Sequence, residues 1–440
     1  MRAGTFLFES LQIAVNRTAT QISSILIVAL LGLYATSLLA AFSLALAAVA
    51  IFFIAITTIQ FGIQAELSQQ FAKRSAQNMY GVFFATLWFV LGASLLSLAI
   101  AYLLPDPFWT VQDSDVRIGA GRAYRILLLS LPLVAAYTTI QFLLESMQHA
   151  SLAFRIKIVH VTFQLAIVMW ILHGRQMPAT AADLAMGYVV ADGVGLLVSF
   201  TAVMLAIDRA PFGAAAQASL RPWRQYRYYA RAIQQGLPVS MGAIAQKYLF
   251  YYMGIHCAAL GASVASAFSI LTAIIFLLQI PIIGISHLAT IKLSYAVGAH
   301  NRELISSTWA AVRKNFFWVA AVLGTLGWGA LSWLLMPFTS DPEVARHVIG
   351  LAYLFPLYYL VSCLFSLLLS LLRGLSDSLY PQLVVNLVLS MAVVPFLALR
   401  PDTSFFTMIS IFCMAGFVAV GMVTMRWKNR YRDVRAAECT

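Results

Sequence analysis

The chain is a succession of long apolar stretches, separated by short segments that hold most of its charges. A helix that crosses a bilayer needs about 20 apolar residues. Since 61% of the residues are hydrophobic and only 10% charged, against about 25% in soluble domains, we infer that lipid is the main solvent. The sequence predicts about twelve spans, near 11–34, 37–66, 79–104, 122–147, 153–173, 183–207, 234–257, 263–294, 309–335, 347–371, 378–399 and 403–427.

The second and eighth stretches belong to an internal repeat. Ala41-Phe42-Ser43 and Leu67-Ser68 recur as Ala267-Phe268-Ser269 and Leu293-Ser294, both displaced by 226 positions (267 − 41 and 293 − 67). A fixed offset indicates duplication. The expected fold is an all-α polytopic membrane protein, with about twelve transmembrane helices in two pseudo-symmetric six-helix bundles. Its expected parts are an N-terminal lobe (1–210), an amphipathic cytoplasmic linker (211–232) and a C-terminal lobe (233–440).

Charge is distributed unevenly over the two sides of the predicted membrane. The formal net charge is +12, but the basic residues lie between apolar runs, which predicts membrane orientation and no nucleic-acid partner. Both termini are expected in the cytoplasm, in a multi-pass protein of a cell membrane such as a bacterial inner membrane. On the opposite side fall only six of the 28 lysines and arginines, Arg117, Arg122, Arg125, Arg175, Arg346 and Arg400.

Two carboxylates lie inside predicted spans and are candidates for ion coupling. Ionisable groups there are costly, so each is a functional candidate. Asp192 lies near the middle of its span, flanked by small residues that let neighbouring helices come close. It could bind and release a proton, because burial disfavours a charged carboxylate. A purely structural pairing with a neighbouring cation is the alternative. Glu145 shares a helix face with Gln141, near the cytoplasmic end of its span; for His160 we expect a satisfied bundle histidine.

Two spans related by the repeat carry candidate substrate-cavity residues. Arg17 and Gln21 share a face of the first span, and the 226-residue offset places Gln21 opposite Lys247 and Thr20 opposite Gln246. These side chains, with Gln141, are therefore expected to line a cavity at the repeat interface, where transporters bind their substrates. Lys247 could pair with one of the carboxylates or bind an anionic group, and Arg17 could instead reach the cytoplasmic face.

The second half contains three motifs: Gly236-Leu237-Pro238 at the start of the seventh span, Gly298-Ala299-His300-Asn301, and Leu372 to Ser378, which contains Arg-Gly-x-x-Asp. They resemble motifs of the multidrug and toxic compound extrusion (MATE) family of the MOP flippase superfamily. Gly298 and Gly374 are expected to close helix C-termini in the left-handed conformation. The first half departs from this pattern: Phe71 to Ser75 replaces the glycine loop.

The resemblance implies a secondary active exporter that moves a small organic molecule or drug out of the cytoplasm by alternating access, as an H⁺ or Na⁺ antiporter. It also implies coordinating carboxylates on the first or seventh span and on the tenth. In this chain the first-span position falls near Ile27, the seventh-span position is Gln246, and the tenth span has no acidic residue. Gln246 cannot titrate, so Asp192 is the best remaining carrier of coupling.

Other functions were weighed against this one. The alternative is a flippase or exporter of an anionic or lipid-linked precursor, from the same superfamily. An enzyme is not expected, because the loops are short and His149 and Asp377 stand isolated in the sequence. No cofactor is expected beyond a coupling ion, and the four scattered cysteines give no metal-ligand spacing. The expected partners are a small-molecule substrate and the bilayer, with the protein a monomer.

Overall fold

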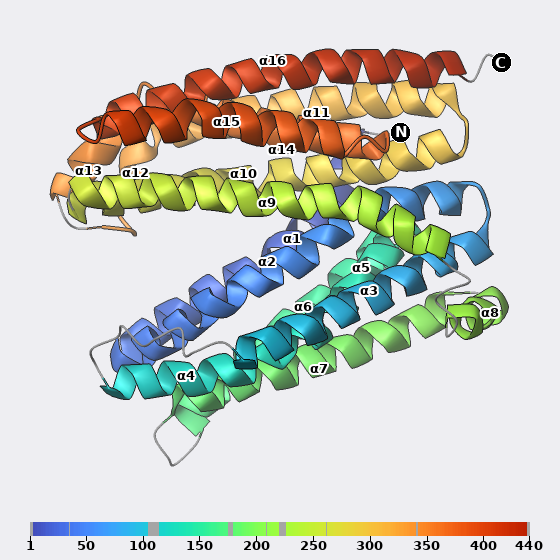
Figure 1. Ribbon diagram of the computed structural model, residues 1–440, viewed down its shortest axis with the longest axis horizontal. Coiled ribbons are helices and arrows are strands. Elements are labelled where there is room, and N and C mark those ends of the chain that lie inside the picture. Colours follow the sequence, from blue (N-terminus) through green and yellow to red (C-terminus); the bar gives the residue numbers. More distant parts are fainter. Residues whose placement is uncertain are drawn as a thin grey trace. The chain divides into compact units, whose positions relative to one another are not determined.

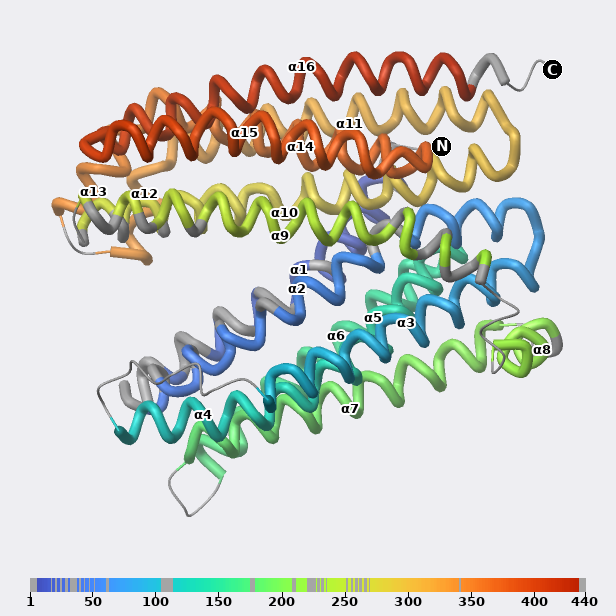
Figure 2. The backbone as a smooth tube through the Cα atoms, in the orientation of Figure 1, coloured from blue at the N-terminus to red at the C-terminus, as the bar shows by residue number. Residues whose placement is uncertain are grey.

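The described chain is helical throughout, with short turns and no strand among the described residues (Figure 1). The computed structural model describes residues 3–34, 36–103, 114–174, 179–207, 209–219, 226–260, 262–339 and 342–437, which Figure 2 follows as a tube. The helices are α1 (Ala3–Tyr34), α2 (Thr36–Ala72), α3 (Ala76–Leu103), α4 (Ser114–Leu128), α5 (Ser130–Ser146), α6 (Ala150–Met169), the π-turn η1 (Trp170–Gly174), α7 (Ala181–Ala206), α8 (Arg209–Ser219), α9 (Tyr226–Leu260), α10 (Ala262–Gly298), α11 (Arg302–Gly329), α12 (Leu331–Leu335), α13 (Pro342–Ile349), α14 (Phe355–Gly374), α15 (Leu379–Leu399) and α16 (Phe405–Ala437).

All twelve predicted stretches coincide with helices, but three of them are divided. The stretch 122–147 is α4 followed by α5, with a bend of 41° between them. The stretch 309–335 is α11 followed by the short α12, and 347–371 begins in α13 and continues as α14. Within the described ranges, eight helices are long and apolar enough to cross a membrane, or up to nine if the bent pair counts as one span. The chain is thus an all-α, polytopic membrane protein.

Packing divides the chain into two compact units. The first unit is Val15–Ser240, and the second is Met1–Ala14 with Met241–Thr440. The first has two apolar clusters, one centred on Phe42 and Tyr188, whose rings lie 5.3 Å apart, and one containing Phe83. In the second, α14 is the most deeply buried helix, and Tyr358 packs its ring edge-on to Phe412 at 5.2 Å. Both units therefore have apolar cores of their own.

The division falls inside α1 and α9, not in the segment between the halves. The first part of α1 belongs to the second unit, where it crosses α10 so closely that a Cβ added at Gly284 would lie 2.1 Å from the carbonyl oxygen of Ser10. Beside this crossing, Lys292 Nζ lies 3.0 Å from Glu9 Oε2. The predicted lobes 1–210 and 233–440 remain a prediction. Packing places the first residues of each half in the unit that is formed mainly by the other half.

The start of α9 makes the corresponding contact in the first unit. A Cβ at Gly236 would lie 2.5 Å from the carbonyl oxygen of Ile59 on α2, and Ser240 Oγ donates to the carbonyl of Ala55 at 2.8 Å. Gly236 is 226 positions after Ser10, and Ile285, next to Gly284, is 226 positions after Ile59. The repeat therefore duplicated this helix crossing together with the helices.

Four helix ends repeat a single C-terminal motif. The residues with positive φ are Arg74 (53°), Gln148 (64°), His300 (50°) and Ser376 (60°), after α2, α5, α10 and α14. In each case the next N–H bonds to a carbonyl five residues back, which is the Schellman arrangement. Arg74 and His300 are again 226 positions apart. The four bonds are Ser75 to Gln70, His149 to Leu144, Asn301 to Ala296 and Asp377 to Leu372, at 2.9–3.2 Å.

The expectation that Gly298 and Gly374 occupy these left-handed positions was wrong. Each is the last residue of its helix, and the left-handed residue follows two positions later. Gly374 instead allows α14 to approach α10, because a Cβ there would lie 3.2 Å from Leu293 Cβ and 3.3 Å from the carbonyl of Thr290. Close approach, not backbone freedom, explains that glycine.

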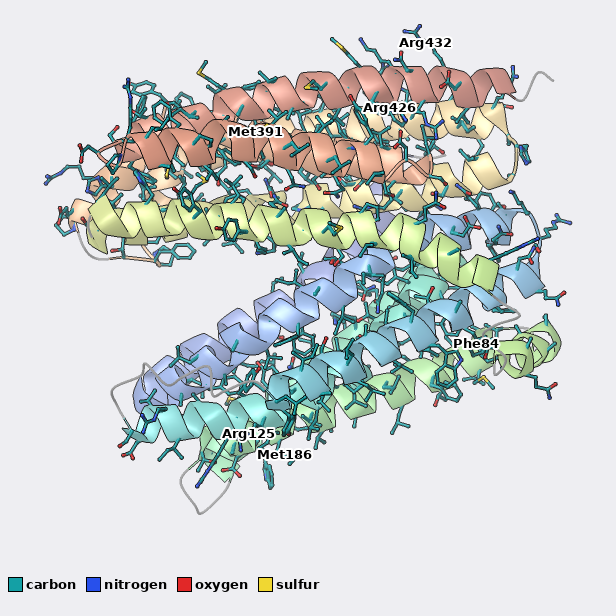
Figure 3. The ribbon with its side chains drawn as sticks, viewed as in Figure 1. Phe84, Arg125, Met186, Met391, Arg426 and Arg432 are labelled. Carbon is teal, nitrogen blue, oxygen red and sulfur yellow. The ribbon has the colours of Figure 1, made fainter. Side chains whose placement is uncertain are left out.

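The predicted linker 211–232 is partly a helix docked on the first unit. Phe212 of α8 packs against Tyr80 and Phe84 of α3, with ring centroids 5.2 and 4.9 Å apart, and Phe84 is labelled beside α8 in Figure 3. Trp88 Nε1 donates to Ser219 Oγ at 3.2 Å. Residues 220–225 lie outside the described residues, and α9 begins at Tyr226.

Candidate functional site

The first unit contains a continuous set of buried polar side chains, which we call the polar seam. It runs between α1, α2, α5, α6 and α7, and every member is at most 7% exposed. Such side chains inside membrane helices must bond to one another, because lipid offers them no partner. The members are Asn16, Ser23, Gln60, Gln64, Tyr137, Thr139, Gln141, Glu145, Ser146, Lys157, His160, Gln164, Asp192 and Ser199.

Glu145 is held at one end of the seam by two side-chain amides. Asn16 Nδ2 of α1 donates to Glu145 Oε1, and Gln64 Nε2 of α2 donates to Oε2 at 2.7 Å. Ser146 Oγ donates to the carbonyl of Gln64 at 3.3 Å. Glu145 is 1% exposed. Since its two carboxylate oxygens accept from amides of two different helices, Glu145 ties α5 to α1 and α2.

Asp192 forms a buried pair with His160 at the other end. His160 Nε2 of α6 lies 3.0 Å from Asp192 Oδ1 of α7, and the two residues are 2% and 6% exposed. Which of the two carries the proton depends on the tautomer and charge of the imidazole. Tyr137 of α5 packs on the imidazole with ring centroids 5.0 Å apart. The pair thus lies between α5, α6 and α7.

Gly195 provides the room for the imidazole. A Cβ added at Gly195 would lie 2.8 Å from His160 Cδ2 and 3.1 Å from Cγ. The sequence suggested that the small residues around Asp192 allow neighbouring helices to approach. In the structure only one of the two glycines has a close neighbour: Gly195 leaves space for the imidazole of His160, whereas a Cβ at Gly193 would have nothing within 4 Å. Close helix packing at small residues is common in membranes.

Two further hydrogen bonds of the seam join different helices. Gln141 Nε2, one turn before Glu145 on α5, donates to Ser199 Oγ on α7 at 3.3 Å, and Ser199 Oγ donates to the carbonyl of Gly195 at 2.8 Å. Ser23 Oγ of α1 donates to Gln164 Oε1, one turn after His160 on α6, at 3.1 Å. The two carboxylates therefore lie in one unit, whose helices are joined by several buried side-chain hydrogen bonds.

Lys157 is a buried cation of the polar seam. It lies on α6, is 7% exposed, and its Nζ is 4.9 Å from the centroid of the Tyr137 ring. An aromatic face attracts a desolvated ammonium group. Tyr137 thus contacts both the histidine and the lysine of the same helix.

The structure describes the side chains of some predicted cavity residues and not of others. In α9 both Gln246 and Lys247 are exposed, and both belong to the second unit, whereas Asp192 and Glu145 belong to the first. The side chains of Arg17 and Gln21 lie outside the described residues. Gln141 is buried in the seam, 2% exposed.

Asp377, which the sequence suggested was isolated, is an ion-pair centre. Arg426 Nε of α16 donates to Asp377 Oδ2 at 2.7 Å, and Arg430 Nε lies 3.4 Å from the same oxygen; Arg426 is labelled in Figure 3. Arg426 also lies over the ring of Tyr380, 5.0 Å from its centroid. The Arg-Gly-x-x-Asp segment therefore fixes the turn after α14 to α16.

Sequence reasoning missed Asn16 and Gln64, the partners of Glu145, and the pairing of Asp192 with His160. A signal for the first existed: Gln60, Gln64 and Ser68 stand at spacings of four on α2, a polar stripe on an otherwise apolar helix. The partner helix could not be inferred from spacing alone, because residues 64 and 145 are joined only by the fold.

The comparisons with known proteins agree on one fold. Residues 13–170 match the MatE family model, and no curated protein matches the chain. The chain is similar to the crystal structure of the eukaryotic MATE transporter AtDTX14 (TM-score 0.79, 16% identity, 99% of each chain covered).

Two further structures match as well. One is a MOP superfamily transporter from Pyrococcus furiosus (TM-score 0.83, 13% identity, 98% of this chain and 97% of the other). The other is an outward-facing multidrug resistance MATE transporter (TM-score 0.83, 12% identity, 98% and 96%). The chain carries a MatE domain in its first half and has the fold of MATE transporters of the MOP superfamily, as the motifs of its second half implied.

Proposed function

We propose that this protein is a secondary active exporter of the MATE type, which moves a small organic molecule out of the cytoplasm by alternating access. The fold shared with MATE transporters over nearly the whole chain supports this proposal. In transporters built from repeats, the substrate binds near the middle of the membrane and the repeats move around it. The two compact units of this chain suit such a movement.

The coupling ion in this proposal is H⁺, and the Asp192–His160 pair binds it. The observation that carries the proposal is a carboxylate and an imidazole 3.0 Å apart, both buried among membrane helices. Histidine titrates in the physiological range in ordinary surroundings. Binding or losing a proton changes the net charge of an enclosed pair, and an enclosed charge strongly biases the conformation around it.

Glu145 has a structural part in this proposal. Both of its oxygens already accept from amides that cannot be deprotonated, so protonation would remove a bond from Asn16 or Gln64. Asp192, in contrast, faces a group that can exchange a proton with it. Of the two candidate carboxylates, the geometry therefore favours Asp192 for coupling.

The test is active efflux from an exporter-deficient bacterial host, with ethidium and fluorescein as cationic and anionic probes. Asp192→Asn and His160→Gln are expected to abolish efflux that a protonophore inhibits, at matched expression. Asp183→Asn is the control: it makes the same chemical change on α7, at an exposed helix cap where Asp183 Oδ2 accepts from Thr180. Efflux that survives both substitutions, or that follows a Na⁺ gradient instead, would remove the pair from the mechanism.

A further inference from the structure

Lys247 is an exposed cation in the middle of a membrane helix. It lies on α9 within the apolar stretch 234–257, at least about 15 Å along the helix axis from either end, at 1.5 Å per residue. Its neighbour Gln246 is exposed too. A lysine near a helix end can extend its ammonium group to the headgroups, but from this depth it cannot. An exposed ammonium group at this depth therefore requires water around it.

The side of α9 suited to lipid is a different one. Leu237, Met241, Ile244 and Tyr248 are 43, 61, 48 and 63% exposed and follow one another at helical spacing. At about 100° per residue around the helix axis, Lys247 lies about 90° from the centre of this apolar face and about 60° from Ile244, at its border. An ammonium group facing hydrocarbon would be unfavourable, and at the border the side chain can extend away from the apolar face.

Among the described acids of its own unit, none forms an ion pair with Lys247. The described acids of residues 241–437 lie in turns or near helix ends, and Asp377 is already paired with Arg426. The central carboxylates of the first unit are also engaged there, Asp192 with His160 and Glu145 with two amides. The acids lie at Glu303, Glu343, Asp377, Asp402 and Asp433.

We propose that Lys247 binds the anionic group of the transported molecule, so that the substrate class is organic anions bearing a carboxylate, sulfonate or phosphate. This inference rests on the proposed function, of which it names the substrate class. A water-filled site with an uncompensated ammonium group attracts an anion and repels an organic cation. The adjacent amide of Gln246 adds a neutral donor that can hydrogen-bond the same group. The anion can come from solution or from a lipid headgroup.

Equilibrium binding tests the site separately from transport. Purified wild type, Lys247→Gln, Lys247→Arg and Lys314→Gln would be titrated with fluorescein and with ethidium, by fluorescence anisotropy in detergent. Lys314 is an exposed cation on α11 and controls for overall charge. We expect fluorescein to bind about tenfold more weakly to Lys247→Gln, as for loss of one charge-assisted bond, and Lys247→Arg and Lys314→Gln to bind like wild type. Equal binding by all four, or a wild-type preference for ethidium, would overturn the proposal.

Transport by proteoliposomes identifies the source of the anion. In vesicles of neutral lipid with an imposed proton gradient, Lys247-dependent movement of fluorescein would indicate a soluble substrate. Lys247-dependent movement of fluorescently labelled phosphatidylglycerol would indicate a lipid headgroup. Lys247-dependent binding without proton-driven movement of either probe would refute the proposed function and leave the anion site standing. If wild type binds neither fluorescein nor the anionic lipid, the anion site itself is refuted.

Discussion

A methyl group at position 195 should displace the histidine of the Asp192–His160 pair. The Cβ of Gly195→Ala would lie 2.8 Å from His160 Cδ2, whereas ordinary contacts are 3.4–4 Å. The ring must therefore move by roughly 0.6 Å, enough to bring a 3.0 Å hydrogen bond to the limit of its range. The alanine cannot relieve this contact itself, because its methyl has no torsion that changes the Cβ position.

The expected energy follows from three effects. Overpacking costs about 1–3 kcal/mol, and a weakened buried bond to a charged group costs up to about 1.5–3 kcal/mol. Replacing glycine by alanine inside a helix stabilises the helix by about 1 kcal/mol. We therefore expect Gly195→Ala to lower the free energy of unfolding by about 2 kcal/mol and to move the pH profile of efflux, because the carboxylate loses its partner.

Gly193→Ala is the matched control. It lies two residues away on the same helix, and its added Cβ would have nothing within 4 Å. It should be unchanged or up to about 1 kcal/mol more stable. The assays are denaturant unfolding in detergent micelles and efflux between pH 5.5 and 8.5, a range chosen to include ordinary histidine titration. If both variants match wild type in both assays, Gly195 does not position His160 and the reasoning fails.

Three other substitutions test other parts of the structure. Gln64→Leu removes one of the two amides that donate to buried Glu145 and should lower the free energy of unfolding by about 1–3 kcal/mol. Gln246→Leu, on an exposed residue, is the control, and an equal change in both variants would contradict a stabilising bond from Gln64 to Glu145. His300→Gly should add about 1 kcal/mol, because glycine adopts φ 50° without strain, and a loss of stability would show that the side chain matters more than the turn. Glu9→Gln should change stability by less than about 1 kcal/mol, since the Glu9–Lys292 pair is partly exposed; a larger loss measured by thermal unfolding would mean that the pair holds α1 on α10.

The sequence predicted the helices and the duplication well, because both depend on local composition. Apolar length alone located all twelve stretches, and the 226-residue offset found from Phe42 and Phe268 recurs in the turns at Arg74 and His300. The breaks after Leu128 and Gly329 were not predicted. They interrupt apolar runs that remain apolar on both sides, so hydropathy does not register them.

The site was predicted residue by residue but not as a set of contacts. Asp192 and Glu145 were found because ionisable groups in spans are costly, and His160 was noted without its partner. What remained unpredicted was which helices meet: Asn16 and Glu145 are separated by 129 positions. Gly374 was misjudged because sequence alone does not separate a glycine needed for its backbone from one needed for close approach. The family motifs were found in the second half, whereas the family model matches residues 13–170.

The crossing of α1 over α10 has a consequence for synthesis. Residues Ala3–Ala14 are synthesised long before their packing partner, the segment around Gly284, which follows the whole first half. Such long-range contacts form late. This segment is therefore among the last to be packed, and the second unit is completed by residues synthesised before the first unit. Halves expressed separately, cut between α8 and α9, would each lack a helix segment that the other half supplies.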